Sequence, residues 1–325
     1  MIGTVPGWSP PAWRDLAPDE LRTYLLELDD HVTHHLDTRP AAGKAAAGDL
    51  SDRQPEDPVY WRNFPVVGQG EEASRSDHIA VFDLGRVADR DRSDERVHVF
   101  PGGFVLEMTW TGTAPGDVPV RARAGMLHFL DADLNLVRVH EYLDSAEVAP
   151  LLIDGVPGVE PKQPVPPEDR GRFHGWVEPR WRDFEPEQLA EHLARIETFV
   201  DGYVRDRPPP GGIDPAAERQ AGIDYPVWRN YRPVGQGEEV GRQEHLEAFD
   251  LLRFDDRRRA DERTYVFPGG FAYEMTWLGT RAGGGDVRTR SLLIYHLDDD
   301  LQIVRLHEYV DSHEVAPLLR HGVTP

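Results

Sequence analysis

VFPGGFVLEMTWTGT, residues 99–113, is the stretch that decides the fold, because it returns as VFPGGFAYEMTWLGT at residues 266–280. Neighbouring stretches repeat at the same offset of 167: WRNFPVVGQGEE becomes WRNYRPVGQGEE, and VRVHEYLDSAEVAPLL becomes VRLHEYVDSHEVAPLL. Between residues 61–152 and 228–319, 54 of 92 positions are identical without a gap. A period of this length is too long for a solenoid unit and indicates a duplicated domain.

A second motif marks the start of each copy. GWSPPAWRDL (7–16) returns as GWVEPRWRDF (175–184) at an offset of 168, so the intervening loop gained or lost one residue. The proline-rich stretch VPGVEPKQPVPPEDRG between the copies is typical of a semi-rigid linker. We therefore expect a first domain at 1–156, a linker at 157–172 and a second domain at 173–325.

Each copy begins with a pattern typical of an amphipathic helix. Apolar residues recur at helical spacing from Leu21 to Val32 and from Leu189 to Val200, in each case after an acidic turn with a proline. The stretches that follow, at 40–57 and 207–224, are rich in Gly, Pro and Ala, which indicates mobile loops or lids.

The remainder of each copy predicts a second helix and then strands. In the first copy the helix is expected at 71–82, and three strands are expected at 98–111, 120–130 and 136–143. Pro101-Gly102-Gly103 is expected to bend the first strand, and Asp131, Asp133 and Asn135 mark the turn between the last two. Helices followed by a strand meander predict an α+β fold, with a curved antiparallel sheet wrapped on helices.

Composition limits the classes of function. The chain has 58 acidic and 36 basic residues and a formal net charge of −22, which repels phosphate backbones and anionic membranes. Neutral or cationic small molecules are the expected partners. The absence of cysteine excludes disulfides, thiolate metal sites and cysteine nucleophiles. The opening MIGTVPGWSPPAWRDL has no basic segment before an apolar run, so we expect a cytoplasmic protein without a membrane span.

The order of helix, "WRNFP" loop, "GQGEE" helix, "EMTW" strand and terminal "HEY.D" strand resembles the SnoaL-like branch of the nuclear transport factor 2-like (ketosteroid-isomerase-like) superfamily, once in each copy. The resemblance implies two tandem cone-shaped α+β barrels, each enclosing one apolar pocket. Members include polyketide cyclases, epoxide hydrolases, dehydratases, isomerases and non-catalytic binding proteins. Many members are homodimers, which leads to the hypothesis that the two copies pack as a pseudo-dimer.

One carboxylate lies in an apolar row of the last strand. Side chains alternate across a strand, so Glu141 shares a face with Val139 and Leu143, and Glu308 repeats this arrangement in the second copy. Desolvation raises the pKa of such an acid and suits it to general acid or base catalysis. The resemblance also implies a pocket acid at this point. The alternative is a structural ion pair with an arginine of the neighbouring strand, Arg121 or Arg123.

A second pair of glutamates, Glu107 and Glu274, lies on the "EMTW" strand on the same face as Thr109 and Thr276. If that face lines the cavity, each glutamate joins the glutamate of the last strand as an acid and base pair. If the other face lines the cavity, the intervening apolar residues form the core instead. Alternation fits both arrangements equally well.

The "WRN" motif contributes Asn63 and Asn230. By the resemblance, these lie near the point where isomerase members carry a catalytic aspartate and epoxide-hydrolase members carry a water-positioning asparagine. An amide orients water or a carbonyl but does not abstract a proton, which argues against ketosteroid isomerisation. Trp61 and Trp228 flank the asparagines, either as pocket walls or as plain core.

Two histidine pairs differ in their expected position. His78 and His245 lie in the predicted second helix, from which they could reach the pocket as substrate-binding residues. His140 and His307 directly precede the strand glutamates, so we expect them on the opposite face. No metal site is expected, because the spaced histidines of the first helix are not repeated in the second copy.

Together these features predict a cofactor-independent acid–base enzyme that acts on a hydrophobic small molecule, in secondary metabolism. Cyclisation, epoxide opening, dehydration and isomerisation all fit. The alternative is a non-catalytic module that holds a hydrophobic ligand or a partner protein. In that module the glutamates form ion pairs with arginines.

Overall fold

The computed structural model describes residues 4–38, 58–63, 72–81, 87–152, 177, 179–231, 239–281 and 284–320. Of these, residues 4–152 and 184–190 form one compact unit, called here the N-terminal unit. Residues 177, 179–183 and 191–320 form the other, the C-terminal unit. The predicted linker at 157–172 lies outside the described residues.

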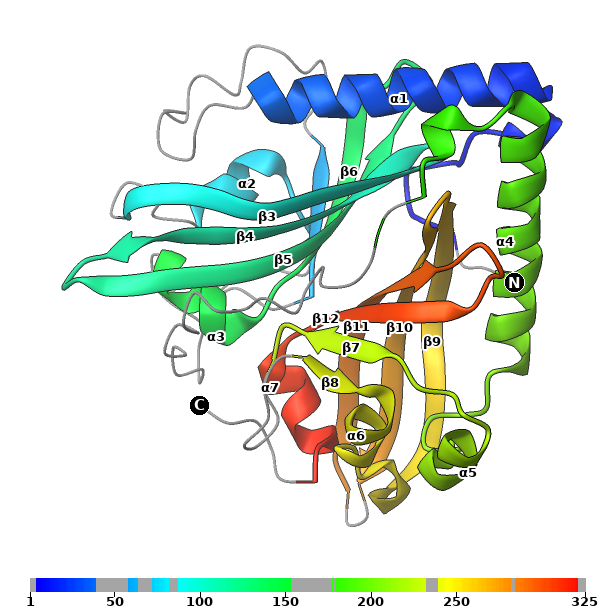
Figure 1. Ribbon diagram of the computed structural model, residues 1–325. Coiled ribbons are helices and arrows are strands. Elements are labelled where there is room, and N and C mark those ends of the chain that lie inside the picture. Colours follow the sequence, from blue (N-terminus) through cyan, green and yellow to red (C-terminus); the bar gives the residue numbers. More distant parts are fainter. Residues whose placement is uncertain are drawn as a thin grey trace. The chain divides into compact units, whose positions relative to one another are not determined.

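The N-terminal unit is built on a six-stranded mixed sheet (Figure 1). Its elements in chain order are α1 (Pro18–Thr38), β1 (Val59–Arg62), β2 (Glu72–Ala73), α2 (Arg75–Ala80), β3 (Ala88–Phe100), β4 (Gly103–Ala114), β5 (Val118–Leu130), β6 (Leu136–Tyr142) and α3 (Ser145–Val148). The strand order is β2-β1-β6-β5-β4-β3. β1 runs parallel to β6, and the other neighbours are antiparallel.

The C-terminal unit has a sheet of the same design. Its elements are α4 (Pro186–Asp206), which belongs to this unit from residue 191 onward, α5 (Pro215–Gln220), β7 (Pro226–Arg229), β8 (Glu239–Gly241), α6 (Arg242–Glu247), β9 (Phe254–Phe267), β10 (Gly270–Arg281), β11 (Asp286–Leu297), β12 (Ile303–Val310) and α7 (Ser312–Val315). The strand order is β8-β7-β12-β11-β10-β9, with β7 parallel to β12.

The α+β class is confirmed in both units. Among the described strands each sheet is open, because β2 and β3 remain at the edges of the first, and β8 and β9 at the edges of the second. Register shifts interrupt the pairing of β3 with β4 and of β9 with β10, at Ser93/Arg96 and Glu274/Thr276. Such bulges bend and twist the strands that contain them.

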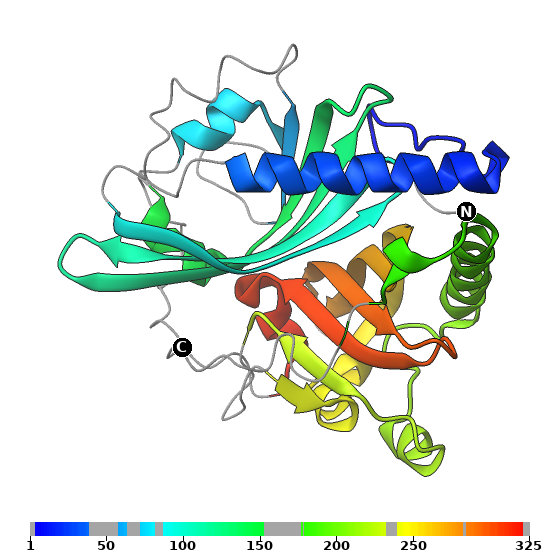
Figure 2. The ribbon, with the colours of Figure 1, turned by 45° about the horizontal axis from the view of Figure 1, so that its top comes forward.

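The two predicted amphipathic helices are confirmed as α1 and α4, and each begins at its proline, Pro18 or Pro186. The aliphatic residues of the predicted stripes are fully buried: Leu21, Leu25, Leu28 and Val32 on α1, and Leu189, Leu193, Ile196 and Val200 on α4. Tyr24, the remaining member of the stripe predicted on α1, is partly buried. Figure 2 shows α1 beside the strands of its own unit. There the hydroxyl of Tyr24 accepts a 2.9 Å hydrogen bond from the backbone N–H of Gly102.

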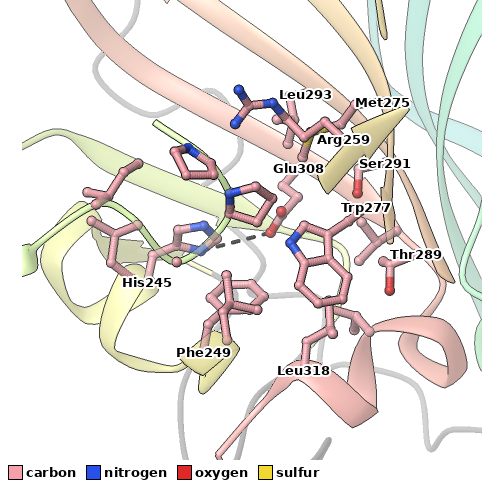
Figure 3. Close-up of a pocket in the computed structure, with 18 of the residues that line it drawn as sticks. His245, Phe249, Arg259, Met275, Trp277, Thr289, Ser291, Leu293, Glu308 and Leu318 are labelled. Atoms are coloured by element: carbon pink, nitrogen blue, oxygen red, sulfur yellow. Dashed lines mark ion pairs between the residues drawn. The ribbon is translucent and has the colours of Figure 1, made fainter. Parts of the chain in front are cut away.

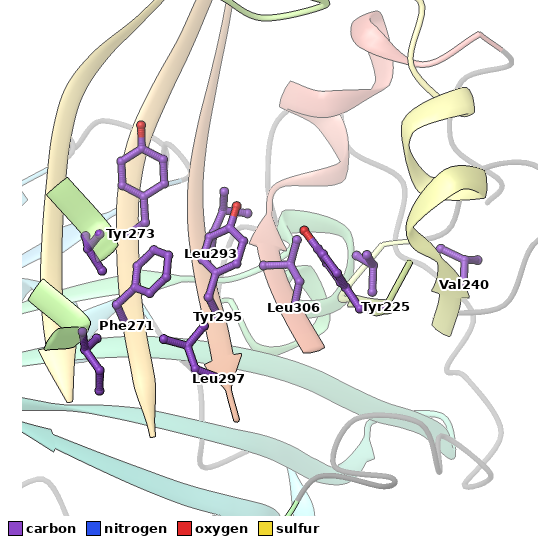
Figure 4. Close-up of a cluster of buried hydrophobic side chains, with 11 residues drawn as sticks. Tyr225, Val240, Phe271, Tyr273, Leu293, Tyr295, Leu297 and Leu306 are labelled. Atoms are coloured by element: carbon purple, nitrogen blue, oxygen red, sulfur yellow. The ribbon is translucent and has the colours of Figure 1, made fainter. Parts of the chain in front are cut away.

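The core of the C-terminal unit contains an unusual number of tyrosines. Tyr225, Tyr273 and Tyr295 are buried together with Phe271 and several aliphatic residues (Figure 4). The rings of Phe271 and Tyr295 stack at 4.6 Å. Each phenol therefore brings a polar hydroxyl into an otherwise apolar cluster.

The prediction of one bent strand at 98–111 is wrong. Residues 101–102 form a turn between two separate strands, β3 and β4, and Gly102 adopts φ +92° there. A left-handed backbone suits glycine, and it reverses the chain instead of bending it. β3 was missed because its first part, ADRDRSDER, is charged and lacks the apolar alternation expected of a half-buried strand.

Two further expectations need correction. The helix expected at 71–82 covers only Arg75–Ala80, because Glu72 and Ala73 pair with β1 as strand β2; Glu71 and Phe82 lie outside the described residues. The segment at 207–224 was expected to be a loop without packed structure, but it contains α5. The corresponding segment at 40–57 lies outside the described residues.

The predicted turn after β5 is confirmed. The Oδ1 atom of Asp131 accepts 2.9 Å hydrogen bonds from the backbone N–H groups of Asp133 and Asn135. Among the described residues, none of the helices combines the length and apolar character needed to cross a lipid bilayer.

Candidate functional site

The face of β12 that carries Glu308 lines a cavity of about 210 Å³ in the C-terminal unit (Figure 3). Side-chain alternation places Leu306, Glu308 and Val310 on this face, as predicted, and all three line the cavity. Neighbouring strands supply Met275 and Trp277 from β10, and Thr289, Ser291 and Leu293 from β11. The α6 helix and the segment at 207–215 complete the wall, including Arg207, Pro208, Pro209, Pro210, Arg242, His245 and Phe249.

Glu308 receives a strong hydrogen bond from the residue that follows the "WRN" motif. The hydroxyl of Tyr231 donates to Oε2 of Glu308 over 2.6 Å, and the guanidinium of Arg229 in turn donates to Tyr231. Burial raises the pKa of Glu308, whereas the Tyr231 hydrogen bond and the charges of Arg229 and Arg207 oppose that rise. The net pKa remains above the ordinary value of a glutamate.

Two ring nitrogen atoms in the cavity lack hydrogen-bond partners among the described residues. Nδ1 of His245 lies 3.8 Å from Oε2 of Glu308, too far for a direct hydrogen bond, and is otherwise unpartnered. The indole Nε1 of Trp277 is also buried without a partner. Figure 3 shows both rings and the carboxylate turned toward the same space.

The pKa of His245 is lowered in the folded protein, which favours the neutral imidazole. Burial lowers its pKa well below the ordinary value, and the nearby charges of Arg229, Arg242 and Arg207 lower it further. A neutral imidazole donates or accepts a hydrogen bond according to its tautomer. His245 lines the cavity, so its predicted reach to the pocket agrees with its position.

The N-terminal unit places the equivalent residues in a similar geometry. Nε2 of His78 lies 3.8 Å from Oε2 of Glu141, and the ring of His78 stacks on Tyr60 at 4.2 Å. Burial raises the pKa of Glu141 to about 7, opposed in part by the charge of Arg62. Burial and Arg62 together lower the pKa of His78 to about 3.

The two carboxylates differ in one partner. Oε2 of Glu141 is buried without a hydrogen bond from any described residue, whereas Oε2 of Glu308 has Tyr231. In the sequence, Phe64 stands where the second copy has Tyr231, and a phenylalanine has no hydroxyl to donate.

Arg123 does not cap Glu141 as the structural alternative expected. It is buried against Glu147, whose Oε2 accepts hydrogen bonds from the backbone N–H (3.0 Å) and the side-chain Nε (3.2 Å) of Arg123. Arg290 and Glu314 repeat this pair in the C-terminal unit. The guanidinium that acts on each strand glutamate comes instead from the paired parallel strand, Arg62 on β1 or Arg229 on β7.

The structure does not bring Glu274 to Glu308. Met275 and Trp277 line the cavity, so alternation along β10 turns Glu274 to the opposite face, where the hydroxyl of Tyr265 donates to its Oε2 over 2.6 Å. Glu107 is buried likewise on β4, with Oε1 3.2 Å from Nε2 of His98. The carboxylate pair expected within one cavity is therefore not formed by these residues.

The asparagines of the "WRN" motif hold the backbone of the last strand. The Nδ2 of Asn63 donates to the carbonyl of Leu143, and its Oδ1 accepts from the N–H of the same residue, both over 3.0 Å. Asn230 likewise accepts from the N–H of Val310 over 3.0 Å. The expected orientation of water by Asn63 is not supported, because both ends of its amide bind the strand end.

The two tryptophans of this motif do not lie on the cavity face. Trp228 pairs with His307 in the parallel register, and its ring lies 5.7 Å from His307 and 5.3 Å from Tyr309. Trp61 packs on His140 and Tyr142 in the same way, with both ring distances 5.2 Å. The opposite-face position expected for His140 and His307 is confirmed, whereas the tryptophans belong to packing on that face.

Sequence reasoning missed several residues that act on the strand glutamates or line the cavity. Arg62 and Arg229 stood in the quoted "WRN" motif, and their parallel pairing with the strand glutamates requires the sheet topology. Tyr231 is the first difference between the two copies of that motif, a signal that was available. Trp277 and Arg207 carried no local signal, because one lies in an apolar strand and the other in a segment expected to be a loop.

Neither protein-family models nor curated proteins give a match to this chain.

Proposed function

We propose that the chain is a cofactor-independent acid–base enzyme, with Glu308 in the C-terminal unit and Glu141 in the N-terminal unit as the proton-transferring groups. The observation that carries the proposal is the convergence of a buried carboxyl of raised pKa, an unpartnered His245 nitrogen and the unpartnered Trp277 nitrogen on one cavity. A carboxyl that titrates closer to neutral pH can both accept and return a proton under ordinary conditions.

The arrangement suits a substrate with one reacting oxygen in an apolar body. A carbonyl, epoxide or hydroxyl oxygen would accept a hydrogen bond from the indole N–H of Trp277, or from His245 in its Nδ1–H tautomer. Glu308 would then remove a proton from a neighbouring carbon or water, or protonate the oxygen as it leaves. Dehydration, isomerisation, cyclisation and epoxide opening share this requirement.

The fold supports a SnoaL-like assignment without establishing it. Both units carry a long helix, a short strand pair, a short helix and long antiparallel strands in this order, with α5 added in the C-terminal unit. The order on which the resemblance rests is similar, except that the "GQGEE" stretch ends in a short strand, β2 or β8, before the helix. The bulges at Ser93/Arg96 and Glu274/Thr276 favour the strand curvature that a cone-shaped sheet requires.

The test is a turnover screen of the full chain against uncharged and acidic aryl epoxides, β-hydroxy ketones and β,γ-enones, followed by variants on any active substrate. We expect Glu308→Gln combined with Glu141→Gln to lower kcat by roughly 10²–10⁴-fold, and each single variant to show which unit acts. Glu244→Gln, an exposed glutamate on α6, is the matched control. Undiminished turnover in the folded double variant would refute the assignment, and ligand binding without turnover of any class would favour the binding module.

A further inference from the structure

The C-terminal unit gathers four tyrosines around one arginine beside the cavity. The guanidinium of Arg207 lies 5.4 Å from the ring centre of Tyr203 and 5.5 Å from that of Tyr273. Its charge also acts on the hydroxyls of Tyr225 and Tyr295. Figure 4 shows the hydroxyls of Tyr225, Tyr273 and Tyr295 on the same side of the hydrophobic cluster.

Two donors in this group are buried and unpartnered. Nη1 of Arg207 and the hydroxyl of Tyr225 have no hydrogen-bond partner in the described part of the chain. A buried polar group without a partner costs free energy, and a guanidinium costs more than a neutral group. Cation–π contacts offset part of that cost, but they leave the N–H donors unused.

The other arginines deep in the wall are already neutralised. Nε and Nη2 of Arg242 each donate to Glu218 over 2.8 Å, and Nε of Arg259 donates to Glu262 over 3.0 Å. No ion pair joins Arg207 to a carboxylate among the described residues. The charge of Arg207 acts on the pKa of Glu308, although the two side chains do not lie within ion-pair distance.

The tyrosine group is a property of the second copy alone. The positions of Tyr203, Tyr225, Tyr273 and Tyr295 correspond in the first copy to His35, Pro58, Leu106 and His128. None of the four tyrosines has a tyrosine counterpart in the first copy, which points to a task that only the C-terminal unit performs.

We propose that the cavity of the C-terminal unit binds a small hydrophobic carboxylic acid, with its carboxylate on Arg207, which lines the cavity. A guanidinium is a donor matched to a carboxylate, and Arg binds this planar anion with two parallel hydrogen bonds. The apolar body lies against Met275, Trp277 and Leu318, which line the same cavity.

The cavity volume matches an acid with a single ring. An engineered apolar cavity of about 150 Å³ holds one benzene molecule, so about 210 Å³ holds a ring with a short acidic chain. The net charge of −22 predicted neutral or cationic ligands, but its long-range repulsion is screened beyond about 8 Å at physiological salt. The local positive charge of Arg207 therefore determines that the cavity binds an anionic ligand. Placement of the reacting carbon near Glu308 rests on the proposed function, whereas binding of the acid does not.

The experiment is calorimetric titration of the full chain with 3-phenylpropanoate and with its neutral counterpart, 3-phenylpropanamide. We expect the acid to bind at least tenfold more tightly than the amide, because the acid gains a charge-assisted hydrogen bond. Arg207→Gln should abolish this preference. Arg205→Gln, which removes an exposed arginine two residues away, should leave it unchanged.

Equal affinity for acid and amide, no acid binding at millimolar concentration, or an unchanged preference in Arg207→Gln would each overturn the proposal. If Arg207→Gln fails to fold by circular dichroism, Arg207→Lys carries the comparison and should reduce the preference, because an ammonium lacks the two parallel donors of a guanidinium. The two hypotheses have separate readouts, because the acid preference tests binding to Arg207 and the turnover screen tests proton transfer by Glu308. A binding preference without turnover would thus contradict only the proposed function.

Discussion

Tyr231 donates a 2.6 Å hydrogen bond to Oε2 of Glu308, and the repeat has a phenylalanine at the matching position 64. A hydrogen bond to the ionised form of a carboxyl stabilises that form and lowers the pKa. The two copies thus hold the same glutamate in the same apolar row, with a hydroxyl donor shown for Glu308 and none shown for Glu141 among the described residues. This hydroxyl is one chemical difference between the two copies, in addition to the tyrosine group around Arg207.

Tyr231→Phe should raise the pKa of Glu308 further above its ordinary value. The change removes a hydrogen bond that lowers the pKa of Glu308, whereas burial, which is the largest cause of the raised pKa, remains. Carbon-13 NMR of side-chain-labelled glutamate across a pH series measures this directly. Tyr265→Phe is the matched control, because Tyr265 donates an equally short bond to Glu274 on the opposite face. An unchanged or lowered pKa of Glu308 in Tyr231→Phe would contradict the role given to this hydroxyl.

Ionisation of Glu141 should lower the free energy of unfolding as the pH rises. Its pKa is about 7 in the folded chain against 4.5 as the ordinary value, so the folded state binds the proton more tightly between these pH values. Stability that is present below pH 4.5 is therefore lost as the pH rises to 7, by up to about 3 kcal/mol for a shift of this size.

Glu141→Gln removes that dependence. Urea denaturation at pH 5 and pH 8 should show that the variant gains stability relative to wild type at the higher pH. His78 titrates with the opposite sign, since its lowered pKa favours the folded state at higher pH, but it is present in both proteins and cancels in the difference. Glu27→Gln, at an exposed position of α1, serves as the control. Parallel pH profiles for wild type and Glu141→Gln would show that the carboxyl is not perturbed.

Features of the fold that depend on residues close together in the sequence could be predicted from it. The stripes of α1 and α4 and the Asp131 turn depend on contacts within a few residues, and they were predicted correctly. Alternation also placed Glu308 and His307 on opposite faces of β12, because the period of a strand is fixed by its geometry.

The remaining features depend on which strands lie side by side. Arg229 acts on Glu308 because β7 pairs in parallel with β12, a long-range pairing that no local pattern reports. The face of β10 could not be chosen, since Glu274 and Trp277 both fit alternation and both are buried. Charged β3 lacked the periodic apolar signal, so the turn at Gly102 was mistaken for a bend.

Asn63→Ala should destabilise the chain by about 2–4 kcal/mol, because it leaves the buried N–H and C=O of Leu143 without partners. Urea unfolding measures the loss. Asn135→Ala, at a partly buried turn, should cost about 1 kcal/mol or less and provides the comparison. Normal stability together with lost turnover would instead restore Asn63 as a residue that positions water.

Gly270→Ala should destabilise the start of β10 by more than about 3 kcal/mol. Gly270 has φ +150°, and an added Cβ would lie 1.9 Å from the carbonyl oxygen of Tyr295 on β11, so the two strands would have to separate. Hydrogen exchange read by mass spectrometry should show lost protection in β10 and β11. Gly202→Ala is the matched control: its Cβ meets only Arg205 at 3.8 Å, and alanine within α4 should stabilise the helix by about 0.5–1 kcal/mol. Because Tyr295 belongs to the tyrosine group around Arg207, Gly270→Ala should also weaken binding of 3-phenylpropanoate. Unchanged protection in β10 and β11 would mean that the sheet tolerates the methyl group, against the close approach that the structure shows.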